Sequence, residues 1–387
     1  MRFPEFSGEW DSFKLVELGK FIGGGTPSSS NLSFWTGSIP WISSSDIKED
    51  NINNISISRY ITEDAIEKSA TKYCPAPVIL IVSRVGVGKV ALSHTSLCTS
   101  QDFCNIIEIK CHPVFLSYNL LRTMKRKSRE VQGTSIKGIT SDELQKIRVF
   151  IPKNKDEQNK ISNLLTLLDE RIATQNKIIE KLQSLIKGLV DELMTVLLKG
   201  KLYPFSSFYI KAGEGGTPTT SVVEYYTEGT IPFIKIEDLS CKYLTNNKDF
   251  ITELGMQKSS AWLIPSKSVI YSNGATIGAI SINEYPVCTK QGILGIVPNT
   301  NINVEYLYLL MSSSYFSKEI SRIITEGTMK TAYLKDINHI KCPLPSMAQQ
   351  KNITNLTSSI EEKLSIEQEL LRFLNLQKQY LLHMIFI

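Results

Sequence analysis

The sequence predicts an α+β protein built from two similar globular domains separated by two long helices, packed as an antiparallel coiled coil with pseudo-twofold symmetry. Three observations support this prediction. Apolar residues recur every three or four positions from Asp156 to Lys199, landmarks of the first half recur in order in the second half, and another apolar stripe ends the chain. We expect four segments: a domain at 1–152, a helix at 153–200, a domain at 201–345 and a helix at 346–387.

Each domain mixes short strands with short helices. Aliphatic and β-branched runs predict buried strands at 78–82, 105–109 and 293–297. Stretches with helical character predict helices at 64–69, 117–130, 304–311 and 315–324. The glycine- and serine-rich stretch at 23–30 is expected to be a loop.

The central stripe has steps that alternate between four and three, interrupted only by Gln175. This period is typical of a helix that pairs with another helix along a narrow seam. At 1.5 Å per residue, roughly 40 residues make a rod of about 60 Å. Lys199 followed by Gly200 is a typical helix end.

The last helix is expected to begin with a capping box, in which Ser346 and Gln349 follow Pro345. If it runs back along the central helix, the two domains lie at opposite ends of a spacer. The alternative is that each long helix only caps its own domain.

The internal repeat is visible in short motifs. Gly24–Pro27 recurs at 215–218, Ile39–Ile42 at 231–234 and Cys98–Gln101 at 288–291. Later matches join Ile147, Pro152, Gln158 and Ile161 to Ile340, Pro345, Gln350 and Ile353. Between these landmarks we match Ser83 with Ser272, which places Arg84 opposite Asn273. Matches in one consistent order indicate a duplicated unit.

Composition indicates a globular protein of two or three domains, with 387 residues, 42% of them hydrophobic and 21% charged. No apolar run reaches the ~18 residues of a membrane span, and Met1–Pro4 lacks the apolar core of a signal peptide. Seven cysteines without a Cys-x-x-Cys pair favour reduced thiols in the cytoplasm. The spacing of Cys98, Cys104, Cys111 and His112 fits no zinc site.

The positive charge is unevenly placed. Residues 1–155 carry 20 Lys and Arg against 15 Asp and Glu, whereas each later segment is balanced, so the net charge of +5 lies in the first domain. Five cations fall within eight residues: Arg122, Lys125, Arg126, Lys127 and Arg129. Such a run is either a solvated helix face or a patch that contacts phosphates.

Catalytic motifs are few. The sequence has no Asn/Asp-Pro-Pro-Tyr methyltransferase signature, no phosphate-binding Gly-x-x-x-x-Gly-Lys-Ser/Thr loop, and scattered histidines. Asp102, Glu108 and Lys110 have the spacing of a metal-dependent nuclease core, but the second copy has Gly292, Pro298 and Thr300. A strand with Glu108 and Lys110 facing solvent also explains the pattern, and the absence of these residues from the second copy favours the strand. A stand-alone nuclease and a protein scaffold without a DNA role remain alternatives.

The remaining features suit DNA binding. Two copies on a rigid spacer could read two half-sites on one face of a duplex. Glycine-rich loops let backbone amides approach phosphates. Polar tips differ between the copies, as Ser44-Ser45 against Ile236-Glu237 illustrates. The predicted contacts in the first domain are Thr26, Ser44, Ser45, Arg84, Lys89, Gln101, Ser135 and Lys137. Those in the second domain are Thr217, Lys235, Asn273, Lys290, Gln291 and Lys330.

The motifs together resemble those of the specificity (S) subunit of type I restriction–modification systems. The resemblance covers nearly the whole chain. It rests on Arg2–Phe6 with Gly8–Trp10, the Gly-Gly-Thr-Pro loop followed by Ile-Pro-Trp/Phe-Ile in each half, Ser83–Lys89, Ile151–Gln158 and Gln377–Leu382.

This resemblance implies two target recognition domains that read a bipartite asymmetric site in double-stranded DNA, with the helices setting the spacer. It implies a non-catalytic chain without its own cofactor or metal, and no membrane association. A methyltransferase (M) partner would carry S-adenosylmethionine, and a restriction (R) partner would use ATP and Mg²⁺. Partners would dock around Gln158 and on the outer faces of both helices. Glu214 before the second Gly-Gly and the neutral second domain depart from the pattern.

Overall fold

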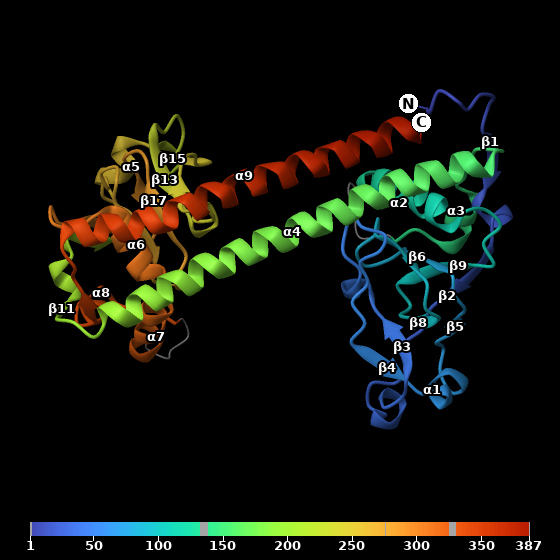
Figure 1. Cartoon of the computed structure of the whole chain (residues 1–387), viewed down its shortest axis with the longest axis horizontal. Helices are drawn as coiled ribbons and strands as arrows, with labels where there is room; N and C mark the ends of the chain where they lie inside the picture. Colours follow the sequence, from blue (N-terminus) through green and yellow to red (C-terminus); the bar gives the residue numbers. More distant parts are fainter. Residues whose placement is uncertain (1, 132–137, 275, 325–329, 387) are drawn as a thin grey trace. The chain divides into compact units, whose positions relative to one another are not determined.

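The computed structural model describes residues 2–131, 138–274, 276–324 and 330–386. It divides into two compact units. Unit 1 comprises Met1–Asn176 and Glu369–Ile387, and unit 2 comprises Lys177–Gln368. Each unit therefore contains one globular domain and a part of both long helices, α4 (Lys155–Leu197) and α9 (Met347–Ile385), which are green and red in Figure 1.

Unit 1 contains two four-stranded sheets and a two-stranded pair over its described residues. The first sheet is antiparallel, with the order β2 (Lys20–Gly23), β9 (Phe103–Ile107), β6 (Val78–Val82), β7 (Val90–Ser93). The second has the order β4 (Arg59–Ile61), β3 (Ile39–Ile42), β8 (Leu97–Thr99), β5 (Tyr73–Cys74), in which β3 and β8 are parallel. The pair joins β1 (Asp11–Lys14) to β10 (Arg148–Ile151).

Unit 2 repeats this topology. Its larger sheet has the order β12 (Tyr209–Glu214), β19 (Ile293–Pro298), β16 (Val269–Ser272), β17 (Ile280–Asn283), β14 (Tyr243–Leu244). Its smaller sheet has the order β15 (Asp249–Ile251), β13 (Ile231–Ile234), β18 (Cys288–Thr289). The pair joins β11 (Leu202–Pro204) to β20 (Lys341–Pro343). The predicted internal repeat and the α+β class are confirmed.

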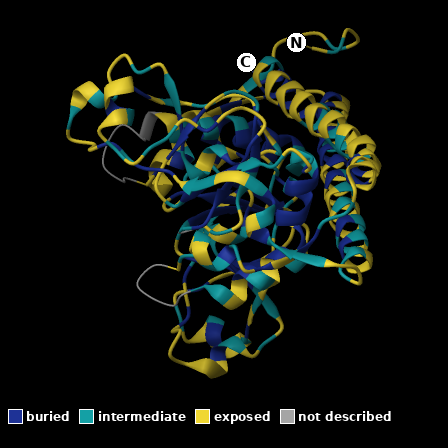
Figure 2. Cartoon of the chain, turned by 90° about the vertical axis from the view of Figure 1, so that its left-hand side faces the viewer, coloured by how far each residue is buried: buried dark blue, intermediate teal, exposed yellow. Residues whose placement is uncertain are grey.

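The strand β6 explains why its sequence is continuously apolar. Every one of its residues is buried, and alternate side chains enter two different cores. Ile79 and Ile81 pack in the core that includes the helices, whereas Val78, Leu80 and Val82 pack in the core between the sheets. Its counterpart β16 divides its side chains in the same way. Figure 2 shows buried residues in dark blue inside the domain that faces the viewer.

The register of the repeat corrects one match made from the sequence. Val82 pairs with Phe103 in unit 1, and Ser272 pairs with Ile293 in unit 2. Ser272 is 190 residues after Val82 and Ile293 is 190 residues after Phe103, so these two pairs correspond. Asn273 therefore lies opposite Ser83, and the match of Ser83 with Ser272 and of Arg84 with Asn273 is wrong by one residue. Both strands are aliphatic, so a slip of one leaves similar letters while it exchanges the two faces.

The helices of the domains lie close to their predicted positions. They are α1 (Glu63–Glu67), α2 (Pro113–Val131), α3 (Ser141–Lys146), α5 (Glu253–Gln257), α6 (Val304–Ser312), α7 (Ser314–Ile323) and α8 (Leu334–Ile337). The single-turn 3-10 helices are η1 (Leu15–Glu17), η2 (Leu32–Trp35), η3 (Ser44–Asp46), η4 (Phe205–Ser207), η5 (Val223–Tyr225) and η6 (Ile236–Asp238). The strand expected at 105–109 ends earlier, because Glu108 has a positive φ of 52°.

Both predicted long helices are present, as α4 and α9. The capping box of α9 is formed: Ser346 N donates to Gln349 Oε1 over 3.0 Å and Gln349 N donates to Ser346 Oγ over 3.4 Å. Among the described residues, no helix is both long and apolar enough to cross a membrane.

Within unit 1, α4 and α9 share one hydrophobic core with α2. The apolar contributors from the two long helices are Ile161, Leu165, Leu168 and Ile172 of α4, with Leu374, Leu381, Leu382, Ile385 and Phe386 from the end of the chain. Burial of each such side chain is worth about 1.5–3 kcal/mol. The alternative that each long helix only caps its own domain is therefore wrong for unit 1.

The helices run antiparallel within unit 1. Lys378 of α9 pairs with Asp169 of α4. Further along the chain, the Phe386 ring lies 6.3 Å from that of Trp10, whose indole donates to Glu157 over 3.1 Å. As the residue number rises from 378 to 386 along α9, the neighbouring residue number on α4 falls from 169 to 157.

Candidate nucleic-acid interface

The Gly-Gly-Thr-Pro loop follows β2 and lies against the segment after β8. Gly25 N donates to the Thr99 carbonyl oxygen over 2.8 Å, and Gly24 N donates to that of Phe103 over 3.4 Å. A Cβ atom on Gly24 would lie 2.0 Å from the Ser100 carbonyl oxygen, so only glycine fits. Both amides are used within the domain. The expectation that this loop offers its glycine amides to phosphates is therefore wrong.

The close approach instead positions the next side chain. Exposed Thr26 donates from its hydroxyl to the amide oxygen of exposed Gln101. Unit 2 brings the same pair together, because Gln291 N donates to Thr217 Oγ1 over 3.4 Å. Each unit therefore joins its predicted threonine and glutamine at the surface, although they are far apart in the sequence.

Arg84 and Gln101 line a cleft of about 1400 Å³ in unit 1. Four further cations line it: Arg126 and Lys127 of α2, Lys146 of α3 and Arg148 of β10. The run on α2 was recognised in the sequence, whereas Lys146 and Arg148 become neighbours of it only through the fold. The cleft is therefore predominantly basic over its described lining.

One acid, Glu143, lines the same cleft. Hydrogen bonds from the Thr140 backbone and hydroxyl, and then the charges of Lys127 and Lys146, hold the pKa of Glu143 below its usual value. The Thr140 amide donates to Glu143 Oε2 over 2.8 Å. Glu143 thus stays ionised and caps the start of α3.

The serine tip after β3 is held by two cations. Lys89 Nζ donates to the Ser44 carbonyl oxygen over 3.2 Å, and the hydroxyl of exposed Ser45 lies 2.8 Å from that of Ser43. Arg59, which was not predicted, donates to Ser43 Oγ over 2.7 Å and lies 4.6 Å from the centre of the Trp41 ring. Its signal in the sequence was weak, because it stands alone among polar residues.

The predicted residues of unit 2 differ in their exposure. Lys290, Gln291 and Lys330 are exposed. Lys235 Nζ pairs with Asp249 over 2.9 Å, and that hydrogen bond raises the pKa of Lys235.

Asn273 is only 1% exposed, and its Nδ2 donates to the Ala332 carbonyl oxygen over 3.1 Å. Its Oδ1 has no hydrogen-bond partner among the described residues. This side chain therefore faces the interior. The predicted Ser135 and Lys137 lie outside the described residues.

Each long helix has a buried glutamine near its start, Gln158 in α4 and Gln350 in α9, whose side-chain oxygen and nitrogen are both used in hydrogen bonds within its unit. We call each of these a glutamine latch. Gln158 is 5% exposed; it accepts from His112 N over 3.0 Å and donates to the Pro152 carbonyl oxygen over 2.9 Å. Gln350 accepts from Asn303 N over 2.8 Å and donates to two carbonyl oxygens. Each glutamine thus connects the start of a long helix to the start of a domain helix.

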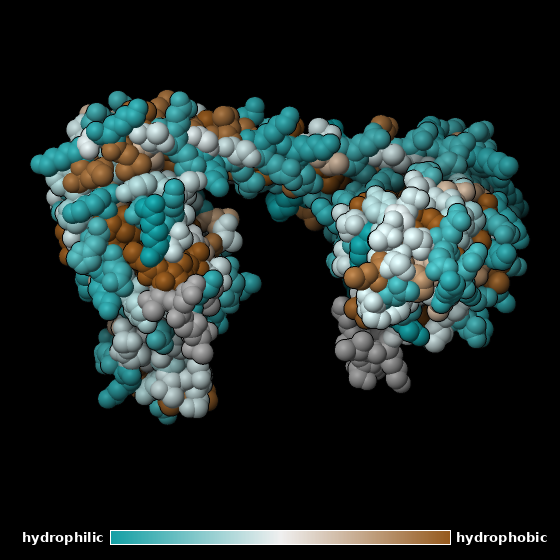
Figure 3. Space-filling view, turned by 90° about the horizontal axis from the view of Figure 1, so that it is seen from below, coloured by the Kyte–Doolittle hydropathy of each residue, from teal (hydrophilic) through white to brown (hydrophobic). Residues whose placement is uncertain are grey.

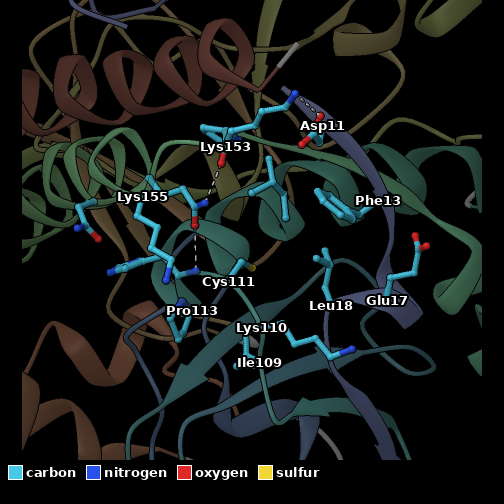
Figure 4. Close-up of a pocket in the computed structure, with 15 residues that line it drawn as sticks. Asp11, Phe13, Glu17, Leu18, Ile109, Lys110, Cys111, Pro113, Lys153 and Lys155 are labelled. Atoms are coloured by element: carbon cyan, nitrogen blue, oxygen red, sulfur yellow. Dashed lines mark hydrogen bonds and ion pairs between the residues drawn. The ribbon is translucent and has the colours of Figure 1, made fainter. Parts of the chain in front are cut away.

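A pocket of about 690 Å³ lies beside Gln158. Figure 4 shows Lys153 and Asp11 joined across it, with a separation of 3.3 Å, and Lys110, Cys111 and Pro113 on the neighbouring wall. The amide of Gln158 itself is already occupied within the unit, by the bonds to His112 and Pro152.

The residues of the nuclease alternative do not form a compact site. Exposed Glu108 lies 3.4 Å from Lys20 Nζ, and Asp102 Oδ2 accepts from Ser100 Oγ over 3.2 Å. In the part of the chain that the structure describes, no group of three or more His, Cys, Asp or Glu residues is placed to hold a metal ion.

Known proteins with similar sequences agree with this architecture. The family model for the type I restriction modification DNA specificity domain matches residues 7–184 and 208–375. The chain is 26% identical to the type I restriction enzyme MjaIX specificity subunit of Methanocaldococcus jannaschii, over 92% of this chain and 88% of that protein. It is 34% identical to the EcoR124I/EcoR124II specificity subunit of Escherichia coli, over 44% of this chain and 43% of that protein.

Solved structures share the fold. A chain from a study of the assembly and conformational transition of a type I R-M system superposes with a TM-score of 0.61 at 14% identity, and 98% of each chain is covered. The S subunit of a type I restriction-modification system from M. genitalium superposes with a TM-score of 0.55 at 17% identity, over 100% of this chain and 99% of that one.

Proposed function

The chain belongs to the type I restriction–modification DNA specificity family, whose specificity subunits recognise DNA without catalysis, and we propose that it reads a bipartite asymmetric site through one half-site per unit. The observation that carries this proposal is the repeated surface pair of threonine and glutamine, Thr26 with Gln101 and Thr217 with Gln291. One scaffold that presents different neighbouring tips in each copy suits two different half-sequences.

The basic cleft of unit 1 supports this proposal. Its cations are suited to contact phosphates. Arg84 is suited to read a base edge, because a guanidinium group can donate two hydrogen bonds to guanine. We assign base contacts to exposed side chains, which are Thr26, Ser45, Arg84, Gln101, Lys290, Gln291 and Lys330. Ser44, Lys89, Thr217 and Lys235 are half-buried and are proposed to contact DNA at the edges of these tips. Asn273 is proposed to position its segment.

We further propose the arrangement of the whole chain. The target recognition domains would be 1–152 and 201–345, and the helices at 153–200 and 346–387 would pair as an antiparallel coiled coil with pseudo-twofold symmetry. The helix contacts inside unit 1 support this pairing. The length of the pair would then set the number of base pairs between the half-sites.

The proposed partners are methyltransferase (M) and restriction (R) subunits, which would carry S-adenosylmethionine and ATP with Mg²⁺. Docking is proposed at the pocket beside Gln158 and on the outer faces of the helices. Figure 3 shows hydrophilic side chains over much of one face, with smaller apolar groups among them. Exposed apolar side chains on the long helices include Leu167, Leu185, Val196, Leu356, Ile366, Phe373 and Tyr380. Seven free cysteines support a cytoplasmic location.

The test is a binding measurement on the complex with its methyltransferase partner. The target site comes from mapping methylated bases in cells that carry the complex. Arg84→Ala should weaken binding by about 1–3 kcal/mol and relax the preference at positions of one half-site only. Arg322→Ala, an exposed arginine of α7 that lies outside the cleft and off the long helices, is the matched control.

Equal weakening on all sequences would assign Arg84 to a phosphate. Unchanged binding would remove it from the interface. If methylation occurred at no defined bipartite sequence, the proposed function itself would be wrong.

A further inference from the structure

A second basic site lies in unit 1, between α2 and the C-terminal part of α9. It is a pocket of about 380 Å³. Helix α2 lines it with four cations at steps of three, one and three, which place them on one side of the helix: Arg122, Lys125, Arg126 and Arg129. Helix α9 lines it with polar side chains four residues apart: Asn375, Gln379 and His383.

The described residues of unit 1 do not balance the charge of this pocket. Its one acid among the described lining is Asp50, and both oxygens of that carboxylate lie 2.8 Å from Lys125 Nζ. Lys378 also forms part of the wall, and it pairs with Asp169. No described residue forms a hydrogen bond or an ion pair with the guanidinium groups of Arg122, Arg126 or Arg129.

Holding these cations together has a cost. Like charges three or four residues apart on a helix repel each other. Arg122 is half-buried, and burial followed by the charge of Arg126 lowers the pKa of Arg122. Buried Leu121 and Leu382 complete the wall and exclude water from one side. A bound anion would relieve the repulsion and would restore hydrogen bonds to the guanidinium groups.

We propose that this pocket binds a phosphate group. Guanidinium groups match the geometry of phosphate oxygens and can donate two hydrogen bonds each. A compact pocket suits a phosphate better than an extended acidic segment. The phosphate could come from the backbone of a duplex or from a free nucleotide.

The duplex is the favoured source. Arg126 lines both this pocket and the cleft that contains Arg84 and Gln101, so a strand seated in the cleft passes beside the pocket. This preference rests on the proposed function, whereas the binding of phosphate does not. Because α9 forms part of the wall, the binding of DNA at this pocket would also depend on the packing of α9 against α2.

The first experiment measures the affinity of the full-length chain for duplex DNA over a series of salt concentrations. The variant Arg122→Gln with Arg129→Gln is compared with Lys20→Gln and Arg372→Gln, which removes equal charge at exposed positions outside both sites. In a plot of log affinity against log salt, the slope should become shallower by about 0.9 for each phosphate that the variant no longer neutralises. The ratio of the wild-type affinity to the affinity of the pocket variant should then fall roughly threefold per phosphate between about 50 and 200 mM salt, on every DNA sequence.

The second experiment measures binding of inorganic phosphate and of ATP by calorimetry, with chloride at equal ionic strength as the reference. The wild type and the control should bind, and the pocket variant should not. A loss confined to the DNA slope identifies the duplex as the source, and a loss confined to phosphate or ATP identifies a free ligand. If the pocket variant matches the control in both experiments, the proposal is overturned. If no version binds duplex DNA, the proposed function fails and calorimetry alone decides the pocket.

Discussion

The two units place an acid–lysine pair at the same position of the repeat but take the lysine from different elements. Asp169 and Glu361 are 192 residues apart, as are the matched Asp46 and Asp238. In unit 1, Asp169 of α4 pairs with Lys378 of α9, and Tyr118 donates to the same carboxylate over 2.8 Å. In unit 2, Glu361 of α9 pairs with Lys242, which belongs to the domain itself.

This difference changes what each pair holds together. The pair in unit 1 is buried, with side chains 5% and 3% exposed, and it joins the two long helices. The pair in unit 2 is more open, with side chains 13% and 20% exposed, and it joins a helix to its domain. A second acid, Glu305, lies 3.6 Å from Lys242 and shares its charge. Duplication has therefore kept the acid while the source of the cation diverged.

The largest expected effect comes from removing the acids. Asp169→Ala leaves the buried ammonium of Lys378 without an acid, with only the Asp50 carbonyl oxygen to accept from it. The free energy of unfolding of unit 1 should therefore fall by about 3–5 kcal/mol. Glu361→Ala leaves Lys242 with Glu305 and partial access to water, so it should cost only about 1 kcal/mol in unit 2. Urea unfolding of the full-length chain measures both values.

The control removes both charges of the buried pair. Asp169→Leu with Lys378→Met replaces the ions with apolar groups of similar size and should regain most of the stability. Equal losses for Asp169→Ala and Glu361→Ala would contradict the contrast between the units. That outcome would mean that burial of the pair, as the structure has it, does not decide its energy.

The sequence could reveal elements but not this pairing. Apolar periodicity located α4, and repeated motifs such as Gly24–Pro27 established the duplication, because both signals are local. Lys378 and Asp169 are distant in the chain, and neither belongs to a motif that pairs them. The match of Arg84 with Asn273 failed because aliphatic strands look alike when shifted by one residue.

The candidate interface was predictable to the same extent. Thr26 and Gln101 belong to motifs that recur, so the sequence could select them, although only the fold brings them together. Lys146 and Arg148 lie outside any charge run and enter the cleft through the packing of α3 and β10. The burial of Asn273 depends on its contact with Ala332, which is distant in the sequence.

The glutamine latches provide a second comparison. Gln350 makes three hydrogen bonds within unit 2 and Gln158 makes two with His112 and Pro152 in unit 1. Each unsatisfied buried group costs about 1–3 kcal/mol. Gln350→Ala should therefore destabilise its unit more than Gln158→Ala does, and urea unfolding measures the difference.

Gln145→Ala is the control, because this half-buried glutamine makes one solvent-exposed side-chain hydrogen bond, to the Ser141 hydroxyl, within the described part of the chain. It should change stability very little. A greater loss for Gln158→Ala than for Gln350→Ala would argue that the additional hydrogen bond does not strengthen the latch of unit 2.

The corrected register predicts different roles for Asn273 and Arg84. Asn273→Ala removes a hydrogen bond to Ala332 but also an unpaired buried oxygen, so the loss of stability should be only about 1 kcal/mol. The preference for each half-site should not change, in contrast to Arg84→Ala. Competition binding with duplexes altered at single positions measures this. Relaxed preference at one position of the second half-site would instead place Asn273 in contact with DNA.

The smallest expected effect distinguishes the caps of α3 and α8. Thr140 and Glu143 form a capping box on α3, whereas Tyr333 at the start of α8 provides no such side-chain bond. The pKa of Glu143 is lowered in the folded chain, so the stabilisation is present above its unfolded pKa and is lost as the pH falls through the folded pKa. Thr140→Val removes the hydroxyl contact of 2.7 Å and keeps the backbone contact, so the pKa of Glu143 should rise only partway to its usual value.

Carboxyl NMR titration measures that pKa, and Thr174→Val is the matched control, since its hydroxyl donates only to the Glu170 carbonyl oxygen within α4 among the described contacts. The control should leave Glu143 unchanged. If Thr140→Val also left it unchanged, the backbone amide and the nearby Lys127 and Lys146 would account for the shift. The backbone amide of the cap, followed by the charges of the cleft, would then hold the pKa of Glu143 down, and the Thr140 hydroxyl would add nothing to the contrast between α3 and α8.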